Sequence, residues 1–339
     1  MGSDGRAQLS IANMGNETVI FWPASIKGYV LESATNLSNP NWVPAGDAVP
    51  VTAVTVLNSS AVRLFRLVAA PPSGMAFIPG GQFTMGDTLD GETNAVPLTV
   101  TVSPFYMDTN LVSYSQWQSV YAWATNTGYQ FTQPGWGYDK EASSPVYDLT
   151  WFDAVKWCNA RSQLAGLKPA YYTDVDLTQL YTGGQLAPFV NWTASGYRLP
   201  TEAEWERAAR GGAIGQRFPW GNVINENLAN YWGDTNLSYD LGPNGPNPVY
   251  GGYPSPVGHF PANAYGLCDM AGNISAWCWD WLGTPYAGGT DPHGPLTGTY
   301  RVLRGGDCTY NAYLARCACR SGYIPTYTLG PGFRCVLGL

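Results

Sequence analysis

Seven cysteines are the most reactive side chains of this 339-residue sequence, and three of them lie close together near its C-terminal end. Residues 305–321 read GGDCTYNAYLARCACRS and contain Cys308, Cys317 and Cys319. A cluster of thiols in so short a run raises the question of a redox centre. A zinc site is not expected, because the sequence has no CxxC pair and its only histidines are His259 and His293.

The same run is rich in tyrosine, which suits recognition rather than redox chemistry. Tyr310 and Tyr313 lie inside it, and Tyr323 and Tyr327 follow shortly afterwards. A tyrosine offers a large amphipathic surface with only two side-chain torsions to freeze, while serine, glycine and asparagine adapt their hydrogen bonds. The residue types therefore leave two uses open for this segment, a redox centre or a binding surface.

The composition limits what can surround this segment. Only 12% of the residues are charged, the net charge is −7, and there are 40 glycines and 26 prolines. Such a chain is expected to be rich in loops, with a polar surface built largely from Asn, Thr, Ser and Tyr. Its acidity and lack of basic runs argue against nucleic-acid binding. No stretch approaches the roughly 20 apolar residues of a membrane span, and no signal peptide is evident at the start.

Two regions of different character are expected to position these residues. Residues 1–72 alternate apolar and polar residues between Asn, Gly and Pro turns, which predicts a small all-β module resembling a β-sandwich. The sequence APPSG at 70–74 is typical of a stiff linker. Residues 75–339 form the second region, in which long loops separate a few periodic segments.

Helices are predicted in the second region from caps and apolar spacing. Residues 113–128 open with Ser113 as N-cap, and residues 150–166 open with Thr150.

A third helix is predicted over residues 201–212, because Thr201 and Glu204 have the spacing of a capping box. On this helix Trp205 is expected to pack inward, while Glu204 and Arg207 face the solvent.

Seven phrases of the second region occur together and in this order in one protein family. They read MAFIPGGQFTMGD (75–87), PVYDLTWFDAVKWCN (145–159), YRLPTEAEWERAARGG (197–212), RFPWGN (217–222), NAYGLCDMAGNISAW (263–277), RVLRGG (301–306) and GFRCV (332–336). Residues 75–339 thus closely resemble the formylglycine-generating enzyme (sulfatase-modifying factor) family. The resemblance implies an α+β, C-type-lectin-like fold with a small twisted sheet, flanking helices and very long ordered loops.

The resemblance also implies what an active member should contain, and this chain departs from it. In the oxidases of the family, two cysteines with four residues between them follow the RGG phrase and bind copper. Counted back from RCACRS (316–321), the second of these positions is Ala312, and the shortened segment before it holds one cysteine, Cys308. A site built from Cys308 with Cys317 or Cys319 would lack the family spacing. We therefore do not expect an enzyme, and copper belongs only to an alternative hypothesis.

Two further features are implied by the family. Its conserved pairing corresponds to a disulfide between Cys158 and Cys335, whereas the partner position of Cys317 is Ala209, so Cys317 is expected to be a buried thiol. A disulfide would favour an extracellular or cell-surface location.

Calcium sites are also known in the family, and they are only partly matched here. Ca²⁺ prefers several anionic oxygens, and the glutamate expected at one site is Ala276. The same side chains could equally stabilise turns, so calcium is an option and no cofactor is required. The candidate ligands are Asn230, Tyr231 and Asp240 at one site, and Asp269, Gly272 and Ile274 at the other.

A second branch of the family, the variable proteins of diversity-generating retroelements, displays a C-terminal binding surface. Its residues are altered by adenine-specific mutagenesis, usually at AAY codons, which cannot yield Lys, Glu, Gln, Met or Trp. None of these five types occurs in residues 307–332. Residues 307–328 are therefore predicted to form a diversified ligand-binding segment, with Trp136 and Trp192 as helpers from other loops. The predicted contacts are Asp307, Cys308, Thr309, Tyr310, Asn311, Tyr313, Ala315, Cys319, Ser321, Tyr323, Thr326, Tyr327 and Thr328.

Three functions follow as hypotheses. The preferred one is a non-catalytic protein that displays this surface to a protein or cell-surface ligand. The first alternative is a copper- or thiol-dependent oxidase that acts on a Cys-containing protein through Cys308, Cys317 or Cys319. The second alternative is an accessory or structural domain of an envelope protein.

Overall fold

The computed structural model of the chain describes residues 9–14, 17–21, 29–35, 43–44, 53–57, 63–69, 71–284 and 286–339. The chain divides into two units, Met1–Ser73 and Gly74–Leu339. Within the described residues, no helix has the length and apolar character needed to cross a membrane.

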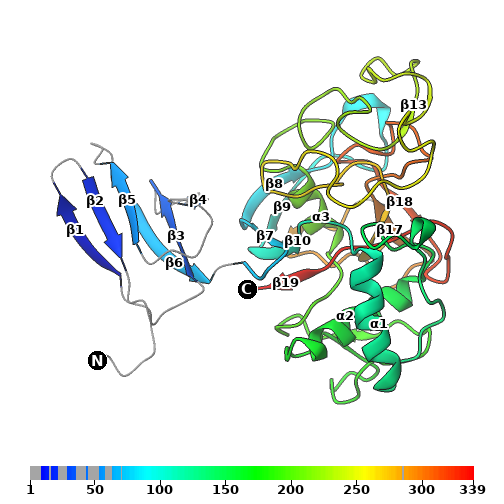
Figure 1. The fold of residues 1–339 in the computed structure, drawn as a ribbon, viewed down its shortest axis with the longest axis horizontal. Helices are drawn as coiled ribbons and strands as arrows, with labels where there is room; N and C mark the ends of the chain where they lie inside the picture. Colours follow the sequence, from blue (N-terminus) through cyan, green and yellow to red (C-terminus); the bar gives the residue numbers. More distant parts are fainter. Residues whose placement is uncertain are drawn as a thin grey trace. The chain divides into compact units, whose positions relative to one another are not determined.

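The described residues of the first unit form two antiparallel sheets of three strands (Figure 1). Ile20 and Leu31 are buried on these sheets. The sandwich arrangement expected for residues 1–72 extends over residues outside the described ones and stays a prediction. The strands, in sheet order, are β1 (Ser10–Met14), β2 (Glu17–Phe21) and β5 (Ala53–Leu57), then β4 (Val43–Pro44), β3 (Tyr29–Ala34) and β6 (Leu64–Ala69).

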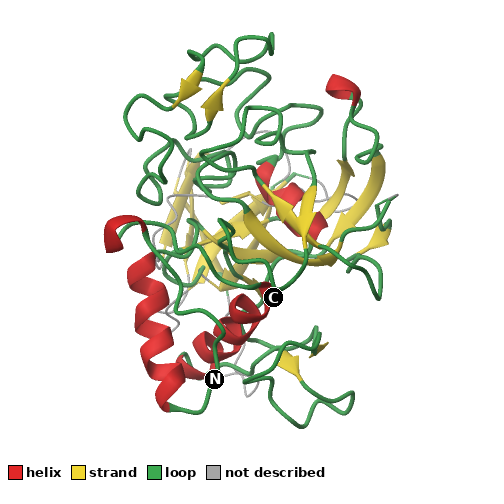
Figure 2. Cartoon of the chain, turned by 90° about the vertical axis from the view of Figure 1, so that its right-hand side faces the viewer, coloured by secondary structure: helices red, strands yellow, loops and turns green. Residues whose placement is uncertain are grey.

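The second unit contains short strands joined by long loops, which make up most of its chain in Figure 2. One sheet joins the two ends of this unit, because Tyr106 of its central strand lies opposite both Phe77 and Leu337. In sheet order the strands are β19 (Val336–Gly338), β10 (Phe105–Asp108) and β7 (Met75–Ile78); β16 (Gly289–Thr290), β9 (Leu98–Val102) and β8 (Gly81–Met85); β15 (Ala276–Trp281), β17 (Arg301–Arg304) and β18 (Ser321–Tyr323); β11 (Tyr171–Tyr172) and β12 (Phe189–Val190); β13 (Trp232–Gly233) and β14 (Gly245–Pro246).

The three predicted helices are confirmed. The helix α1 (Tyr114–Asn126) is capped by Ser113, whose side chain accepts a hydrogen bond from the Gln116 amide. The helices α2 (Trp151–Leu164) and α3 (Glu202–Ala209) open with capping boxes at Thr150 and Thr201. Short 3₁₀ turns η1 (Leu89–Gly91) and η2 (Tyr138–Lys140) complete a mixed α and β fold with few helices.

Aromatic packing fixes the helices to the sheets. Trp117 of α1 and Trp157 of α2 stack in parallel with ring centroids 5.9 Å apart, and Phe333 meets both rings edge-on. Trp205 of α3 is buried in a second apolar cluster with Cys317. Such large buried aromatic side chains dominate core energetics, so the unit presents its loops on a rigid base.

The expectation that Glu204 faces the solvent is wrong. Glu204 is 7% exposed and forms a two-point ion pair with Arg198, at 2.7 and 2.6 Å. Arg207 is only half-buried and donates to the carbonyl of Pro79. The helix α3 is covered on its charged side as well, because arginines from distant segments neutralise its carboxylates.

Candidate ligand-binding site

The segment 305–331 leaves the buried strand β17 through two glycines in the left-handed region, Gly305 with φ 93° and Gly306 with φ 66°. A Cβ on Gly306 would lie 2.9 Å from the carbonyl carbon of Leu314. The close approach requires glycine and lets the segment fold back on itself.

Buried arginines anchor the backbone of this segment. Arg304 donates to the carbonyl of Cys317 at 2.9 Å, and it also pairs with Glu206. Arg320 forms a two-point ion pair with Glu202 of α3, at 2.7 and 2.6 Å. Bidentate pairs of this kind hold geometry as well as charge, so the loop is presented on a fixed scaffold.

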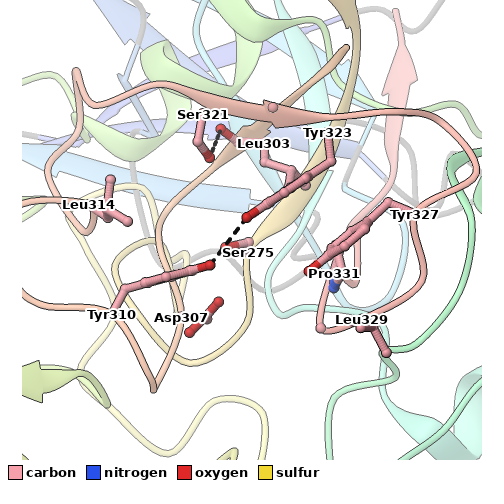
Figure 3. A pocket seen from close by; sticks show the side chains of 12 residues that line it. Ser275, Leu303, Asp307, Tyr310, Leu314, Ser321, Tyr323, Tyr327, Leu329 and Pro331 are labelled. Carbon is pink, nitrogen blue, oxygen red and sulfur yellow. Dashed lines mark hydrogen bonds between the residues drawn. The ribbon is translucent and has the colours of Figure 1, made fainter.

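A cavity of about 300 Å³ lies over this scaffold (Figure 3). Seven of its twelve lining residues belong to the predicted segment 307–328, and Ser275 alone comes from outside 303–331. The lining residues are Ser275, Leu303, Asp307, Tyr310, Leu314, Ser321, Gly322, Tyr323, Tyr327, Leu329, Gly330 and Pro331.

Three tyrosines shape the cavity. Tyr323 and Tyr327 stack with ring centroids 4.1 Å apart and an angle of 9° between the rings. The hydroxyl of Tyr310 lies 3.4 Å from that of Tyr323, and this hydrogen bond raises the pKa of Tyr310 above its usual value. The Tyr310 phenol therefore stays neutral at physiological pH and can both donate and accept hydrogen bonds.

Asp307 supplies the charge of the cavity. It is half-buried, and burial raises the pKa of its carboxyl, although hydrogen bonds from Thr309 act in the opposite direction. Its Oδ1 accepts from the amide of Thr309 at 2.8 Å and from the hydroxyl of Thr309 at 2.6 Å. The carboxylate is thus fixed in place by its own turn.

Two predicted contacts are fixed beside the cavity. The amide of Asn311 donates to Asp234 at 3.3 Å. The hydroxyl of Tyr313 donates to Glu92 at 2.8 Å, and the guanidinium of Arg316 lies 4.2 Å above its ring. Neither residue lines the cavity.

Three predicted contacts are corrected by the structure. Cys308, Ala315 and Cys319 are 3%, 1% and 3% exposed, so they cannot meet a ligand where they lie. Ala315 packs with Phe218 in an apolar cluster, and the Cys308 thiol donates to the carbonyl of Gly252 at 3.3 Å.

The sequence analysis missed some residues that line the cavity and included others that do not line it. Leu303 and Ser275 reach the cavity only because β17 pairs with β15, which their local sequence does not reveal. Leu329 lies one residue beyond the predicted segment, and a longer segment would have included it. The threonines at 309, 326 and 328 do not line the cavity, nor do Trp136 and Trp192, the latter stacked on His293 at 3.5 Å.

The alternative copper site does not fit these residues. Burial raises the pKa of Cys308, Cys317 and Cys319 to about 12 each, so all three are protonated thiols at neutral pH, whereas copper binds thiolates. The family position occupied here by Ala312 is fully buried in the apolar cluster of Phe218. Within the described ranges, no group of three or more His, Cys, Asp or Glu side chains is arranged to hold a metal ion.

Two further predictions concern cysteines that lie in the scaffold. Cys317 is a fully buried thiol beside Ala209 in one cluster, as predicted. The sulfurs of Cys158 and Cys335 lie 3.6 Å apart, but both are free thiols in the structure. The two sulfurs of the predicted pair are therefore neighbours in the structure but are not bonded to each other, and the disulfide stays a prediction.

The predicted calcium ligands lie in tight loops, and some of their side-chain oxygens accept hydrogen bonds while others have no partner. Both carboxylate oxygens of Asp240 are used, by the hydroxyl of Tyr231 and by the amides of Asp234 and Gly242. Asn230 keeps a buried side-chain oxygen without a hydrogen-bond partner.

At the other predicted calcium site, Asp269 accepts from the Gly258 amide at 2.8 Å, and its second oxygen is buried without a partner. Gly272 and Ile274 lie in the same loop. Each set offers one unsatisfied oxygen, and calcium at both stays a prediction.

Comparison with known proteins places the second unit in a family. A family model described as a sulfatase-modifying factor enzyme 1-like domain matches residues 64–339. The formylglycine-generating enzyme of Thermomonospora curvata is 34% identical over 292 residues, 77% of this chain and 92% of that protein. The chaperone protein LppX of Paenibacillus barcinonensis is 32% identical over 266 residues, 72% of this chain and 86% of that protein.

A solved structure extends the likeness to the fold. Treponema denticola variable protein 1 matches with a TM-score of 0.61 and 24% identity, covering 83% of this chain and 97% of that chain. At this identity the match shows a shared fold. The family model and the relatives establish that this chain belongs to the formylglycine-generating enzyme (sulfatase-modifying factor) family.

Proposed function

We propose that this chain is a non-catalytic binding protein, and that residues 307–331 form its ligand-binding surface on the family scaffold. One observation carries the proposal: seven of the twelve residues that line the cavity of about 300 Å³ belong to the segment 307–328, which the residue pattern singles out. Its tyrosine, serine and glycine lining is typical of surfaces that recognise proteins. The ligand is a protein or another cell-surface molecule.

We further propose that this surface is diversified by a retroelement. The absence of Lys, Glu, Gln, Met and Trp from residues 307–332 supports this origin, and the likeness of fold to a variable protein is consistent with it. The DNA beside the gene tests the proposal. We expect a near-identical template repeat whose adenines fall at the codons of the exposed lining residues. Unrelated DNA with no such repeat would reject diversification.

The second candidate function is the oxidase, and the names of relatives such as the Thermomonospora curvata enzyme favour it. Copper titration of the reduced protein distinguishes the two. We expect no tight Cu(I) site and no oxygen consumption with a Cys-containing peptide, because the three thiols are buried and protonated. Stoichiometric Cu(I) binding that is lost in Cys308→Ser, together with peptide-dependent oxygen uptake, would make the oxidase the better assignment.

A further inference from the structure

The cavity carries one sign of charge. Asp307 is the only charged side chain among its twelve lining residues, which include no lysine or arginine. Asp148 lies close by, because its Oδ1 accepts from the amide of Gly330 at 2.9 Å. Any charged group of a ligand that enters the cavity therefore meets a negative potential.

Asp307 differs from the two glutamates that pair with arginines of the segment 305–331. Glu92 pairs with Arg316 at 2.9 Å, and Glu202 pairs with Arg320 at 2.6 Å. Among the ion pairs between described residues, none includes Asp307. A carboxylate withdrawn from water without a cation is unfavourable, and a cationic ligand would relieve this cost.

The tyrosine rings add a second attraction for a cation. Figure 3 shows Tyr310 on one side of the cavity and the stacked pair of Tyr323 and Tyr327 on the other. Hydrogen bonding to Tyr323 raises the pKa of Tyr310, and burial raises that of Tyr327; the charge of Asp307 adds to both shifts. Asp307, Tyr310 and Tyr327 line the same cavity, and ring faces attract cations.

We propose that this cavity binds the cationic side chain of a lysine or arginine on a protein partner. The inference rests on the proposed ligand-binding function and names the chemistry of that ligand. A volume of about 300 Å³ is at the lower end of the roughly 300–1,000 Å³ of ligand pockets, which suits one side chain. The net charge of −7 favours the approach of a basic partner.

The test is a titration of the full chain with three peptides that differ only in the central side chain. They are acetyl-Gly-Lys-Gly-amide, its norleucine counterpart and its glutamate counterpart, followed by calorimetry or NMR. Norleucine keeps the apolar stem of lysine and lacks the charge. We expect the lysine peptide to bind at least about tenfold more tightly than either of the others.

Variants separate the two sources of attraction. Asp307→Asn should weaken lysine-peptide binding about tenfold, because it removes the charge and keeps the oxygen that Thr309 uses. Its matched control is Asp176→Asn at an exposed site outside the cavity, which changes the net charge equally. Should Asp307→Asn fold poorly, Tyr327→Leu tests the rings, and Tyr327→Phe, which keeps the ring, should bind more tightly than Tyr327→Leu.

Two results would overturn the inference without deciding the proposed function. Equal or tighter binding of the norleucine or glutamate peptide would show a binding cavity with another preference. No binding of the lysine peptide at any attainable concentration would remove the cation site, while the neighbouring DNA would still decide whether the segment is diversified.

Discussion

At the scale of single residues, burial decides what the cysteines can do. Cys308, Cys317 and Cys319 occur in a run that resembles a redox cluster, but each thiol is shielded from water. Burial raises the pKa of all three to about 12. Because the thiolate is the nucleophile and the metal ligand, these residues act as small apolar side chains.

Thiol labelling tests this interpretation. In the native, reduced protein at about pH 8 we expect Ellman's reagent to react slowly, and first at the partly exposed Cys268. All seven cysteines should react once the protein is unfolded. Rapid labelling of Cys308 or Cys319 in the native protein would contradict the interpretation that these thiols are buried and unreactive, and it would favour the oxidase hypothesis.

A second prediction concerns the buried Glu206. Burial alone would raise the pKa of this carboxyl, but attraction to Arg210 and Arg304 outweighs burial and leaves it below its ordinary value of 4.5. A carboxyl of this kind stabilises the fold at pH values above its pKa in the unfolded chain. This contribution to the free energy of unfolding is lost as the pH falls through the pKa of the group in the folded protein.

Glu206→Gln should therefore lower the free energy of unfolding at neutral pH by about 3–5 kcal/mol, since it takes from buried Arg210 and Arg304 the carboxylate closest to each. The difference from the wild type should shrink as pH falls below 4.5. Urea unfolding across this pH range measures it. Exposed Glu141→Gln is the control and should change stability by less than about 0.5 kcal/mol; a Glu206→Gln difference that stays constant with pH would refute the linkage.

At the scale of elements, the contact between α2 and the segment leading into β19 ties two distant parts of the chain. Cys158 and Cys335 are 177 residues apart in sequence, and their sulfurs lie 3.6 Å apart. A bond here would close a long loop, which in the chain-entropy model stabilises a protein by about 5 kcal/mol.

We expect mild oxidation to join Cys158 to Cys335. Peptide mass mapping without reduction should find the two peptides linked, and urea unfolding should shift to higher concentration relative to the reduced protein. Cys158→Ser is the control and should show no such shift. Oxidised protein in which both thiols stay free, or in which Cys335 joins another cysteine, would count against the pairing.

At the scale of the whole molecule, the chain divides into two units. The second unit, Gly74–Leu339, contains the two large apolar clusters and the cavity. The family match nevertheless begins at residue 64, within β6 of the first unit.

Residues 74–339 produced alone should fold, unfold in one cooperative transition and bind the lysine peptide as the full chain does. Circular dichroism with urea and the peptide titration measure this. A longer fragment, 64–339, is the comparison. If only the longer fragment folds, β6 is required by the second unit and the boundary at residue 74 is wrong.

Local signals in the sequence were sufficient for some features and not for others. The helices were predictable because Ser113, Thr150 and Thr201 satisfy helix termini through neighbours three residues away. The burial of Glu204 was not, because its partner Arg198 lies outside the helix and the covering segments come from elsewhere. Local charge pattern carries no information on what packs over a helix.

By itself, the sequence determined the family, the three helices and the segment proposed to bind the ligand, since these depend on short phrases and residue types. Only the tertiary structure decided which side chains of that segment are available. Tyr310, Tyr323 and Tyr327 line the cavity, whereas Cys308 and Cys319 are enclosed. The physical reason is that an irregular loop has no period that separates inward from outward positions, so distant packing partners set the burial of each side chain.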